Sequence, residues 1–281
     1  MRRVAVIGII GNSVFMPVKN FHRGGETVEA SSIHFEFGGK GFNAAVAASR
    51  CGVGVSFLAA IGREYREEAK DFLDKEKIKH TLVFKNEATA FASIVTNSEG
   101  KNRVTVYQGA QLSSEDVSLF EEEIKTADIL LLNNEVDEAV NIEAVRVAKR
   151  YGVKCILNPA PARELDGYIL DTVDLFTPNE HELLGIDEKK NVIVTLGERG
   201  CLIKEKNLII PAKNSGKTVD TTGAGDTFNG VLSAMLACGS GATKAAEIAN
   251  KVASLEVTRR YAVSSIPTGD EIKKIIEETE K

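Results

Sequence analysis

The segment Asp220-Thr-Thr-Gly-Ala-Gly-Asp-Thr-Phe-Asn-Gly230 joins two glycines and a carboxylate to the start of a predicted helix. Gly223 and Gly225 let backbone N–H groups approach a ligand, and first-turn N–H groups have no intrahelical partner, so the segment predicts an anion-binding turn. Asp226 follows directly, although a carboxylate repels phosphate. It makes sense as a base that takes a proton from a hydroxyl while a phosphoryl group arrives, which is the chemistry of a small-molecule kinase.

A second glycine-rich segment, Gly38-Gly-Lys-Gly-Phe-Asn43, precedes an alanine-rich predicted helix. Its glycines permit close approach of a substrate, and Lys40 and Asn43 offer hydrogen-bond donors to sugar hydroxyls. An ordinary turn at the start of a helix explains the same residues equally well. Glu135 follows an apolar predicted strand, where it either binds substrate hydroxyls or is simply solvated.

Polar residues also follow the predicted strand that ends at Thr177-Pro178. Asn179 and Glu182 would share one face of a first helical turn at the carboxyl end of that strand, where open α/β sheets bind ligands. They can hold Mg²⁺ through water, although a plain helix N-cap is favoured by the local sequence alone. The segment Thr195-Leu-Gly-Glu-Arg-Gly200 ends another strand and fits either a nucleotide border or a tight hairpin turn.

The composition limits the classes of partner. The chain has 281 residues and a net charge of −5, which gives no reason to expect nucleic acid or an anionic membrane as a partner. The longest apolar runs are too short to span a membrane. Four cysteines and four histidines are scattered without metal-type spacing. They favour reduced thiols in a cytoplasmic protein and argue against a zinc site.

Strand and helix patterns alternate along most of the chain and predict one α/β domain over residues 1–281, with a doubly wound, mostly parallel sheet flanked by helices. Strands are expected at 4–10, 55–60, 129–132, 154–157, 175–177 and 192–196, and helices at 41–51, 66–76, 142–151, 224–237, 244–257 and 270–280. β-rich segments at about 14–37 and 88–108 interrupt this pattern. They predict a small β-sheet lid that excludes water from phosphoryl transfer, or alternatively an edge extension of the main sheet.

Six segments occur in the order seen in ribokinase-like carbohydrate kinases of the phosphofructokinase-B type, and the chain resembles that family from Val4 to about Pro267. The segments are residues 38–43, 158–165, 177–182, 195–200, 220–230 and 257–260. The resemblance implies an α/β core with a small β lid that often mediates dimerisation. It also implies ATP-dependent phosphorylation of a primary sugar hydroxyl, with Mg²⁺ and an activating potassium ion.

The resemblance further implies roles for individual residues. Asp226 corresponds to the catalytic base, and the N–H groups of Gly223, Ala224 and Gly225 would stabilise the transferring phosphoryl group. Sugar contacts are expected, besides Asp226, from Asn12, Ser13, Gly39, Lys40, Asn43 and Glu135. ATP contacts are expected from Asn179, Thr195, Gly197, Gly225 and Asn250. Asn179 and Glu182 would hold Mg²⁺ through water, and a monovalent cation site would lie near Asp220, Thr222, Glu256 and Ser265.

Three departures from the family pattern bear on the substrate and the cation. The family's Asn-x-Asp after the first strand is replaced by Gly11-Asn12-Ser13, and an unmatched sugar hydroxyl costs about 1–3 kcal/mol. Ribose is therefore the leading expectation, with a nucleoside or another sugar such as a ketose as the alternative. A non-catalytic sugar or nucleotide sensor is the alternative of another class, but a sensor needs no base at Asp226. The stretch between Glu182 and Val192 is too short for the family's extra helix, and Tyr261 replaces a glycine beside the potassium site.

Overall fold

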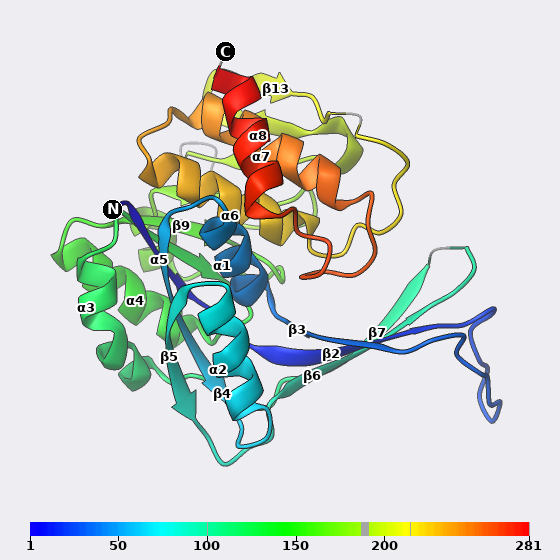
Figure 1. The fold of residues 1–281 in the computed structure, drawn as a ribbon. Helices are drawn as coiled ribbons and strands as arrows, with labels where there is room; N and C mark the ends of the chain where they lie inside the picture. The colour runs from blue at the N-terminus through cyan, green and yellow to red at the C-terminus, as the bar shows by residue number, and fades with distance from the viewer. Residues whose placement is uncertain (100, 187–190, 214, 281) are drawn as a thin grey trace.

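A six-stranded parallel sheet forms the core of the computed structural model, which describes residues 1–99, 101–186, 191–213 and 215–280 (Figure 1). Its strand order is β10-β9-β8-β1-β4-β5, and every neighbouring pair is parallel. Strands with apolar runs buried along their length, as in β8, indicate a sheet covered on both faces. The strands are β1 (Arg3–Ile7), β4 (Gly54–Ile61), β5 (Ile78–Phe84), β8 (Ile129–Asn133), β9 (Lys154–Asn158) and β10 (Leu175–Phe176).

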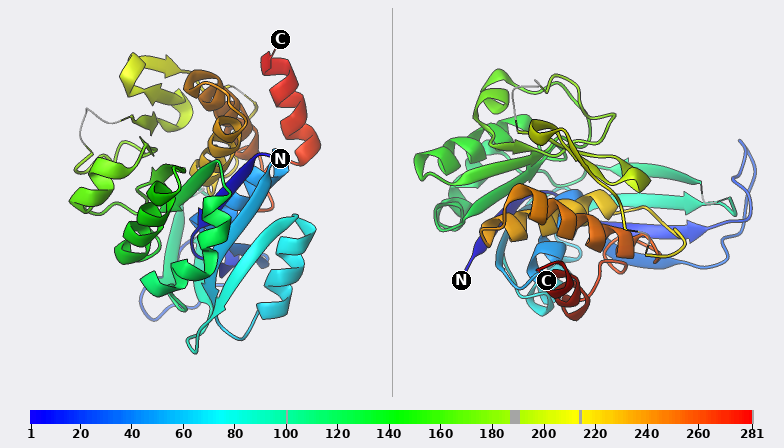
Figure 2. Two further views of the ribbon diagram at one scale, coloured as in Figure 1. Left: turned by 90° about the vertical axis from the view of Figure 1, so that its left-hand side faces the viewer. Right: turned by 90° about the horizontal axis from the view of Figure 1, so that it is seen from above.

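Helices cover the two faces of this sheet (Figure 2), and each face carries its own apolar cluster. One cluster packs α1 (Lys40–Arg50), α2 (Arg66–Lys75), α6 (Ala224–Ala237), α7 (Ala242–Glu256) and α8 (Gly269–Glu280) on the sheet. The other contains η1 (Ser114–Phe120), α3 (Glu121–Lys125), α4 (Glu138–Arg150) and α5 (Gly167–Thr172). None of the described helices is long and apolar enough to cross a membrane.

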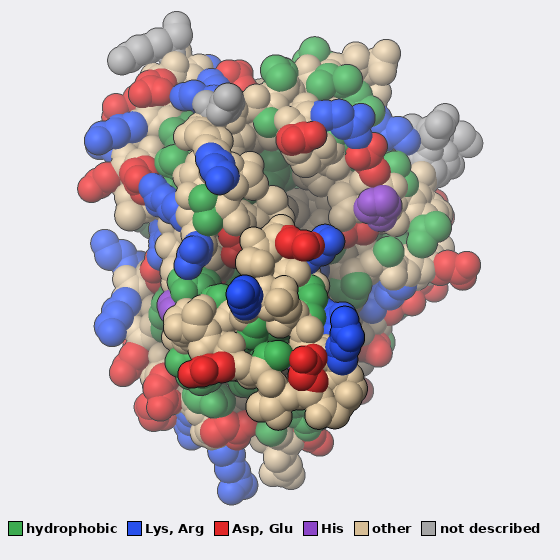
Figure 3. Space-filling view, turned by 90° about the vertical axis from the view of Figure 1, so that its right-hand side faces the viewer, with side chains coloured by type: hydrophobic (Ala, Val, Ile, Leu, Met, Phe, Trp, Pro, Cys, Tyr) green, Lys and Arg blue, Asp and Glu red, His purple; other side chains and the backbone are tan. Residues whose placement is uncertain are grey.

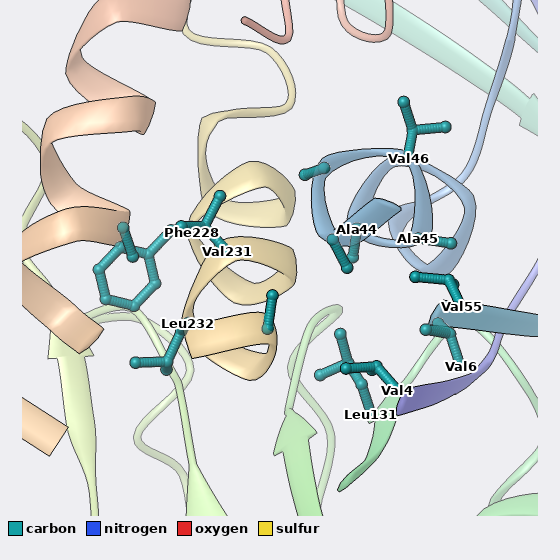
Figure 4. Packing of buried hydrophobic residues seen from close by; sticks show 14 of the residues in the cluster. Val4, Val6, Ala44, Ala45, Val46, Val55, Leu131, Phe228, Val231 and Leu232 are labelled. Atoms are coloured by element: carbon teal, nitrogen blue, oxygen red, sulfur yellow. The ribbon is translucent and has the colours of Figure 1, made fainter. Parts of the chain in front are cut away.

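Helices α1 and α6 pack together closely above the sheet; in Figure 4, Phe228 and Leu232 lie on the side of α6 away from α1, and Ala44 lies on α1 beside α6, within one apolar cluster. At the crossing, a Cβ on Gly230 would collide with the carbonyl oxygen of Ala44 and lie 2.9 Å from the Cβ of Ala47. Glycine and alanine are therefore required here by the distance between the two helix backbones.

A second, four-stranded sheet projects from the core (Figure 1) and is called the lid below. Its strands are, in spatial order, β3 (His34–Gly38), β2 (Gly11–Pro17), β6 (Ala90–Thr96) and β7 (Asn102–Tyr107). The β2–β3 and β6–β7 pairs are antiparallel, whereas β2 and β6 run parallel. The predicted fold class, a doubly wound α/β core with a small additional β-sheet, is confirmed.

A third sheet lies at the β10 edge and departs from the expected pattern. Strand β11 (Ile193–Thr195) was expected to extend the parallel sheet, but it pairs antiparallel with β12 (Cys201–Ile203), which pairs with β13 (Leu208–Ile210). Among the described residues, two isolated parallel bridges, Phe176 to Val192 and Asn179 to Thr195, connect it to the region of β10. The reason is the short connection through η2 (Gly197–Arg199), since tightly linked strands can pair only antiparallel.

Candidate active site

The glycine turn before α6 forms the centre of the candidate active site. Gly223 is the N-cap of α6 with φ of 87°, a left-handed conformation that favours glycine. No side chain caps the helix, so the N–H groups of its first residues are directed at the space beyond its N-terminus. Asp226 lies in this first turn and is 8% exposed. The sequence-based pairing of an anion-binding turn with a buried carboxylate is thus present in the geometry.

Two residues of α1 contact the Asp226 carboxylate. Asn43 donates its Nδ2 to Oδ2 at 2.8 Å, and the Nζ of Lys40 lies 3.9 Å from Oδ1. Burial raises the pKa of Asp226, whereas Lys40 and the Asn43 hydrogen bond lower it. Asp226 in turn is the main cause of a raised pKa at Lys40, which keeps the ammonium charged. The arrangement holds a desolvated carboxylate in a fixed orientation beside a cation, as a general base requires.

Glu135 lies on the other side of Lys40. Its Oε2 accepts the backbone N–H of Lys40 at 2.6 Å, and its own N–H donates to Oδ1 of Asn133 at 2.9 Å. Burial raises the pKa of Glu135 to about 7. The structure therefore brings Lys40, Asn43, Glu135 and Asp226 together from α1, the turn after β8, and α6.

A cavity of about 10 Å³ lies directly beneath this cluster, between α1, α6 and the carboxyl ends of β8 and β9. Asn229, one helical turn after Asp226, lines it with a buried Oδ1 that has no partner. Sequence reasoning did not single out Asn229, although an amide on an otherwise apolar helix was a usable signal. The larger cavity, of about 740 Å³, lies at the amino ends of β8, β9 and β10, away from Asp226. Because parallel sheets bind ligands at their carboxyl ends, we place the active site around Asp226.

The residues predicted to contact a sugar lie where the lid meets the core. Gly39 has φ of 120°, and a Cβ there would collide with the carbonyl oxygen of Ile9. A Cβ on Gly38 would lie 3.0 Å from Oγ of Ser13, which places β2 next to the glycine-rich segment. Asn12 is 9% exposed, and its Oδ1 is buried without a hydrogen-bond partner. Asn12 thus offers an acceptor to a ligand at this junction.

Asn179 and Glu182 form a closed turn rather than the predicted helical turn. Glu182 accepts the N–H of Asn179 at 2.9 Å through Oε2 and its Nδ2 at 2.7 Å through Oε1. Residues 179–186 contain turns but no helix. Residues 187–190, which belong to the stretch that is shorter than in the family pattern, lie outside the described residues. The Glu182 carboxylate thus accepts both hydrogen bonds, one from the backbone and one from the side chain of Asn179, and closes the turn. Glu182 also raises the pKa of Lys40, so its charge acts on the same cluster.

The remaining nucleotide-side predictions lie along the β11–β12 hairpin. Thr195 donates its N–H to the carbonyl of Pro178 at 2.9 Å, which holds it beside Asn179. Gly197 begins η2 with φ of 59°. The Nδ2 of Asn250 donates to the carbonyls of Ile210 and Pro211 at 3.0 and 3.1 Å. Asn250 thus holds the end of β13 and the start of the following loop, next to this hairpin.

The predicted cation neighbourhood is rich in oxygen atoms. Oδ1 of Asp220 accepts the N–H and hydroxyl of Thr222, and its Oδ2 accepts the N–H of Tyr261 at 3.1 Å. Glu256 is 1% exposed, lies 3.2 Å from the Ser265 hydroxyl through Oε1, and keeps a buried, unpartnered Oε2. Burial raises the pKa of Glu256 to about 8. This donor set fits a hard cation, which would compensate the buried carboxylate.

Two observations complete the description of the site. Among the residues that the structure describes, no group of three or more histidine, cysteine or acidic side chains could hold a metal ion. The surface is hollowed on the side from which the lid projects (Figure 3).

Sequence reasoning missed Glu36 of β3, which contacts the segment after α7. The available signal was an acidic residue inside the apolar pattern of β3.

Comparison with known proteins identifies the family. A family model described as pfkB family carbohydrate kinase matches residues 1–269. The ribokinase of Haemophilus influenzae is 32% identical over 98% of this chain and 99% of its own length. The bifunctional ribokinase/ribose-5-phosphate isomerase A of Fructilactobacillus sanfranciscensis is 33% identical over 98% of this chain, which spans 56% of that protein.

A solved structure gives the same result. The crystal structure of a ribokinase from Thermotoga maritima is similar with a TM-score of 0.88 and 29% identity, over 99% of this chain and 100% of that chain. The six ordered segments, the fold and the full-length matches agree with one another. The prediction of an ATP-dependent carbohydrate kinase is confirmed, and the chain belongs to the pfkB family of carbohydrate kinases.

Proposed function

We propose that this kinase transfers the γ-phosphoryl group of ATP to the primary hydroxyl of D-ribose, giving ribose 5-phosphate. The carrying observation is the buried Asp226 carboxylate in the first turn of α6, directly behind the Gly223 turn and beside Lys40 and Asn43. A base and an anion-binding turn on one helical turn suit the transfer of a phosphoryl group to a hydroxyl.

In the proposed step, a sugar hydroxyl gives its proton to Asp226 while its oxygen forms a bond to the γ-phosphorus. The bond from that phosphorus to the bridging oxygen of ATP breaks, and ADP leaves. The N–H groups of Gly223, Ala224 and Gly225 stabilise the charge of the transferring group at the helix N-terminus. Lys40 favours the ionised form of Asp226 against the opposing effect of burial, because a cation beside a buried carboxylate lowers its pKa.

The sugar pocket consists of residues from the lid junction and from both sides of Lys40. Gly39 gives the close backbone approach, and Asn43 and Glu135 flank Lys40. The unpartnered Oδ1 of Asn12 accepts a sugar hydroxyl, in place of the aspartate that the family pattern has at the position of Ser13. The remaining contacts of this pocket come from Ser13, Lys40 and Asp226.

The nucleotide side consists of the β11–β12 hairpin and the Asn179 turn. We assign ATP contacts to Asn179, Thr195, Gly197, Gly225 and Asn250. Mg²⁺ would be held by Asn179 and Glu182 through water, since both oxygens of Glu182 already accept hydrogen bonds within the turn. Mg²⁺ would neutralise charge on the ATP phosphates.

A monovalent cation would be held by Asp220 and Glu256, with help from Thr222 and Ser265. The buried Oε2 of Glu256 supports this assignment, because an unpaired carboxylate oxygen is costly without a proton or a cation. We expect potassium chloride to raise the melting temperature more than choline chloride at equal ionic strength. Equal melting temperatures in the two salts would remove the assignment.

We also propose that the lid mediates a homodimer. Ile33, Phe35, Val104, Val106 and Tyr107 are each more than half exposed on or beside lid strands. Such an apolar surface is typical of a protein contact. Light scattering should give twice the monomer mass of 30.3 kDa, and a monomer mass at assay concentration would refute the dimer.

The proposed substrate is tested by ADP release with ATP and Mg²⁺ over ribose, other pentoses, fructose and nucleosides, with and without potassium. A strong ribose signal supports the proposal. A signal only with fructose or a nucleoside makes Gly11-Asn12-Ser13 the determinant of a different specificity. Silence over the whole panel favours a sensor, in which case sugar or nucleotide still binds in calorimetry without turnover.

A further inference from the structure

The carboxylate of Glu36 is bound by consecutive backbone N–H groups of the segment after α7. Its Oε1 accepts the N–H of Ala262 at 2.7 Å and that of Val263 at 3.2 Å. Its Oε2 accepts the N–H of Ser264 at 3.0 Å and the Ser264 hydroxyl at 2.7 Å. Successive N–H groups that converge in this way form an anion-binding concavity. Here the anion belongs to the lid, and the concavity belongs to the core.

Aromatic contacts reinforce this connection. The ring of His34, two residues before Glu36 on the same face of β3, stacks on Tyr261 with centroids 3.8 Å apart and planes 14° apart. Phe15 of β2 meets Tyr261 edge to face at 5.2 Å. Tyr261 has φ of 76°, which is costly for a residue with a Cβ. The two lid contacts offset that cost.

The same core segment is bonded to the loop that precedes α6. The N–H of Tyr261 donates to Oδ2 of Asp220 at 3.1 Å. Oδ1 of Asp220 accepts the N–H of Thr222 at 3.0 Å and its hydroxyl at 2.7 Å. Thr222 immediately precedes Gly223, the N-cap of α6. Glu36, the backbone of residues 261–264, Asp220 and Thr222 therefore connect β3 of the lid to the anion-binding turn through hydrogen bonds and adjacent residues of the chain.

Strand β3 also continues directly into the sugar side of the site. It ends at Gly38, and Gly39 and Lys40 follow at once. Glu36 is therefore connected to two parts of the active site. Along the chain it lies three to four residues before Gly39 and Lys40 of the sugar-binding segment, and through its carboxylate it contacts residues 262–264, next to the residue that binds Asp220 before the phosphate-binding turn. The Glu36 side chain is only 7% exposed, and its bonds to Ala262 and Val263 are partly buried, whereas those to Ser264 lie at the surface.

We propose that Glu36 is a positioning residue that couples the sugar site to the nucleotide site by fixing the lid on residues 261–264. Sugar that binds against β2 and β3 holds the lid in place, and the Glu36 bonds then hold the phosphate-binding turn in its active conformation. Sugar and nucleotide consequently bind more tightly together than separately, and the effect is reciprocal. The proposal rests on the sugar kinase function described above.

The first experiment measures the contact without any substrate. Hydrogen–deuterium exchange of the amides of residues 262–264 is compared between the wild type, Glu36→Gln and the control Glu29→Gln. Glu29 is an exposed acidic residue in the segment between β2 and β3 of the lid, so its variant has the same change of charge. Glutamine presents an N–H₂ group where N–H donors converge, so exchange should become faster in Glu36→Gln alone. Unchanged protection would overturn the proposal.

The second experiment measures the coupling itself. Calorimetry gives the affinity for a non-hydrolysable ATP analogue with and without saturating D-ribose. The wild type should show tighter binding with sugar, by a factor in the usual range of about 5- to 150-fold. In Glu36→Gln the factor should fall toward one, while the affinity without sugar changes less than about threefold. A wild type without coupling, or a Glu36→Gln variant that retains it, would overturn the proposal.

A second variant guards against misfolding of the first. Tyr261→Gly suits the positive φ and removes the stack on His34, so it should fold and should lower the coupling factor as well. Failure of the ribose assignment has a different signature: ADP release with ribose is absent, while the exchange difference at residues 262–264 persists. Coupling is then measured with whichever acceptor the substrate panel identifies, or with the sugar or nucleoside that binds without turnover, under the same criteria.

Discussion

Asn43 donates its side-chain N–H to the carboxylate of Asp226 at 2.8 Å, across 183 positions of sequence. The two residues come from the first turns of α1 and α6, which the glycine at 230 allows to lie close together. The bond fixes the orientation of the carboxylate and supports its charged form, because a donor to a carboxylate lowers its pKa. The orientation of the proposed base is thus set by a helix that begins in the sugar-binding segment.

The Asn43 contact can be tested by deletion. Asn43→Ala should lower kcat by about 10- to 100-fold, because the carboxylate loses its orienting donor and a misplaced base transfers protons poorly. The rate should also require a higher pH, since the pKa of Asp226 rises without the bond. Steady-state kinetics from pH 6 to 9 measure both effects. Asn20→Ala, at an exposed position, is the control and should match the wild type.

Removal of the base itself should separate catalysis from binding. Asp226→Asn should lower kcat by about 10²- to 10⁴-fold, the usual contribution of a general base, with little loss of affinity for ADP. Turnover is measured by ADP release and affinity by calorimetry. Asp71→Asn, in the exposed part of α2, should leave both unchanged. An Asp226→Asn enzyme with normal turnover would refute the assignment of the base.

The raised pKa of Glu135 makes the stability of the protein depend on pH. The folded state protonates Glu135 at about pH 7, whereas the unfolded chain does so near its ordinary value of 4.5. Between these values the folded state holds more protons, so the contribution of Glu135 to the free energy of unfolding is complete below about pH 4.5 and is lost as the pH rises through about 7.

Glu135→Gln should therefore show a smaller decrease of the unfolding free energy from pH 5 to pH 7 than the wild type. Chemical denaturation at several pH values gives the comparison. A residual decrease that continues to about pH 8 is expected in both proteins from Glu256, whose pKa is raised to about 8. Identical pH dependence of the two proteins up to pH 7 would show that Glu135 titrates normally.

The two glycines of the phosphate-binding turn should respond differently to alanine. At Gly223, φ is positive and a Cβ would lie 2.9 Å from Oε1 of Glu256, so alanine should cost about 1–2 kcal/mol of stability and also lower kcat. At Gly225, within α6, a Cβ would meet no atom within 4 Å outside the backbone of its own helix, so alanine should not lower the stability. Any loss of kcat in Gly225→Ala then reports a ligand that needs the bare backbone. Thermal melts and ADP release distinguish these cases, and an equal loss of stability at both positions would contradict the expectation.

Local patterns in the sequence predicted the parallel core and α6 well, because burial on both faces and helical periodicity are written into consecutive residues. The predicted helix at 224–237 agrees with α6, and the glycines before it indicated the turn around Asp226. Local patterns do not show which segments pair with one another in space. The segment at residues 195–200 allowed a tight hairpin turn but did not decide between a hairpin and an extended parallel sheet, and β11 pairs antiparallel with β12.

The same limit explains the missed and the mistaken site features. Glu36 and Ala262 are 226 positions apart, so no local pattern could connect them. The spacing of Asn179 and Glu182 fits a helical turn and a closed turn equally well, and the structure has a turn closed by bonds from the backbone N–H and the Nδ2 of Asn179 to the Glu182 carboxylate. Periodicity describes one segment at a time, whereas an active site is assembled from several.

The missing side chain at Gly230 has a consequence for the chemistry. Because the backbone of α6 touches Ala44 and Ala47 there, the separation of the two helices is fixed by van der Waals contact rather than by adjustable side chains. Lys40 and Asn43 belong to α1 and Asp226 belongs to α6. The interval between the acceptor sugar and the base is therefore set by how closely the two helix backbones pack. One added methyl group at position 230 would lengthen that interval and slow the reaction.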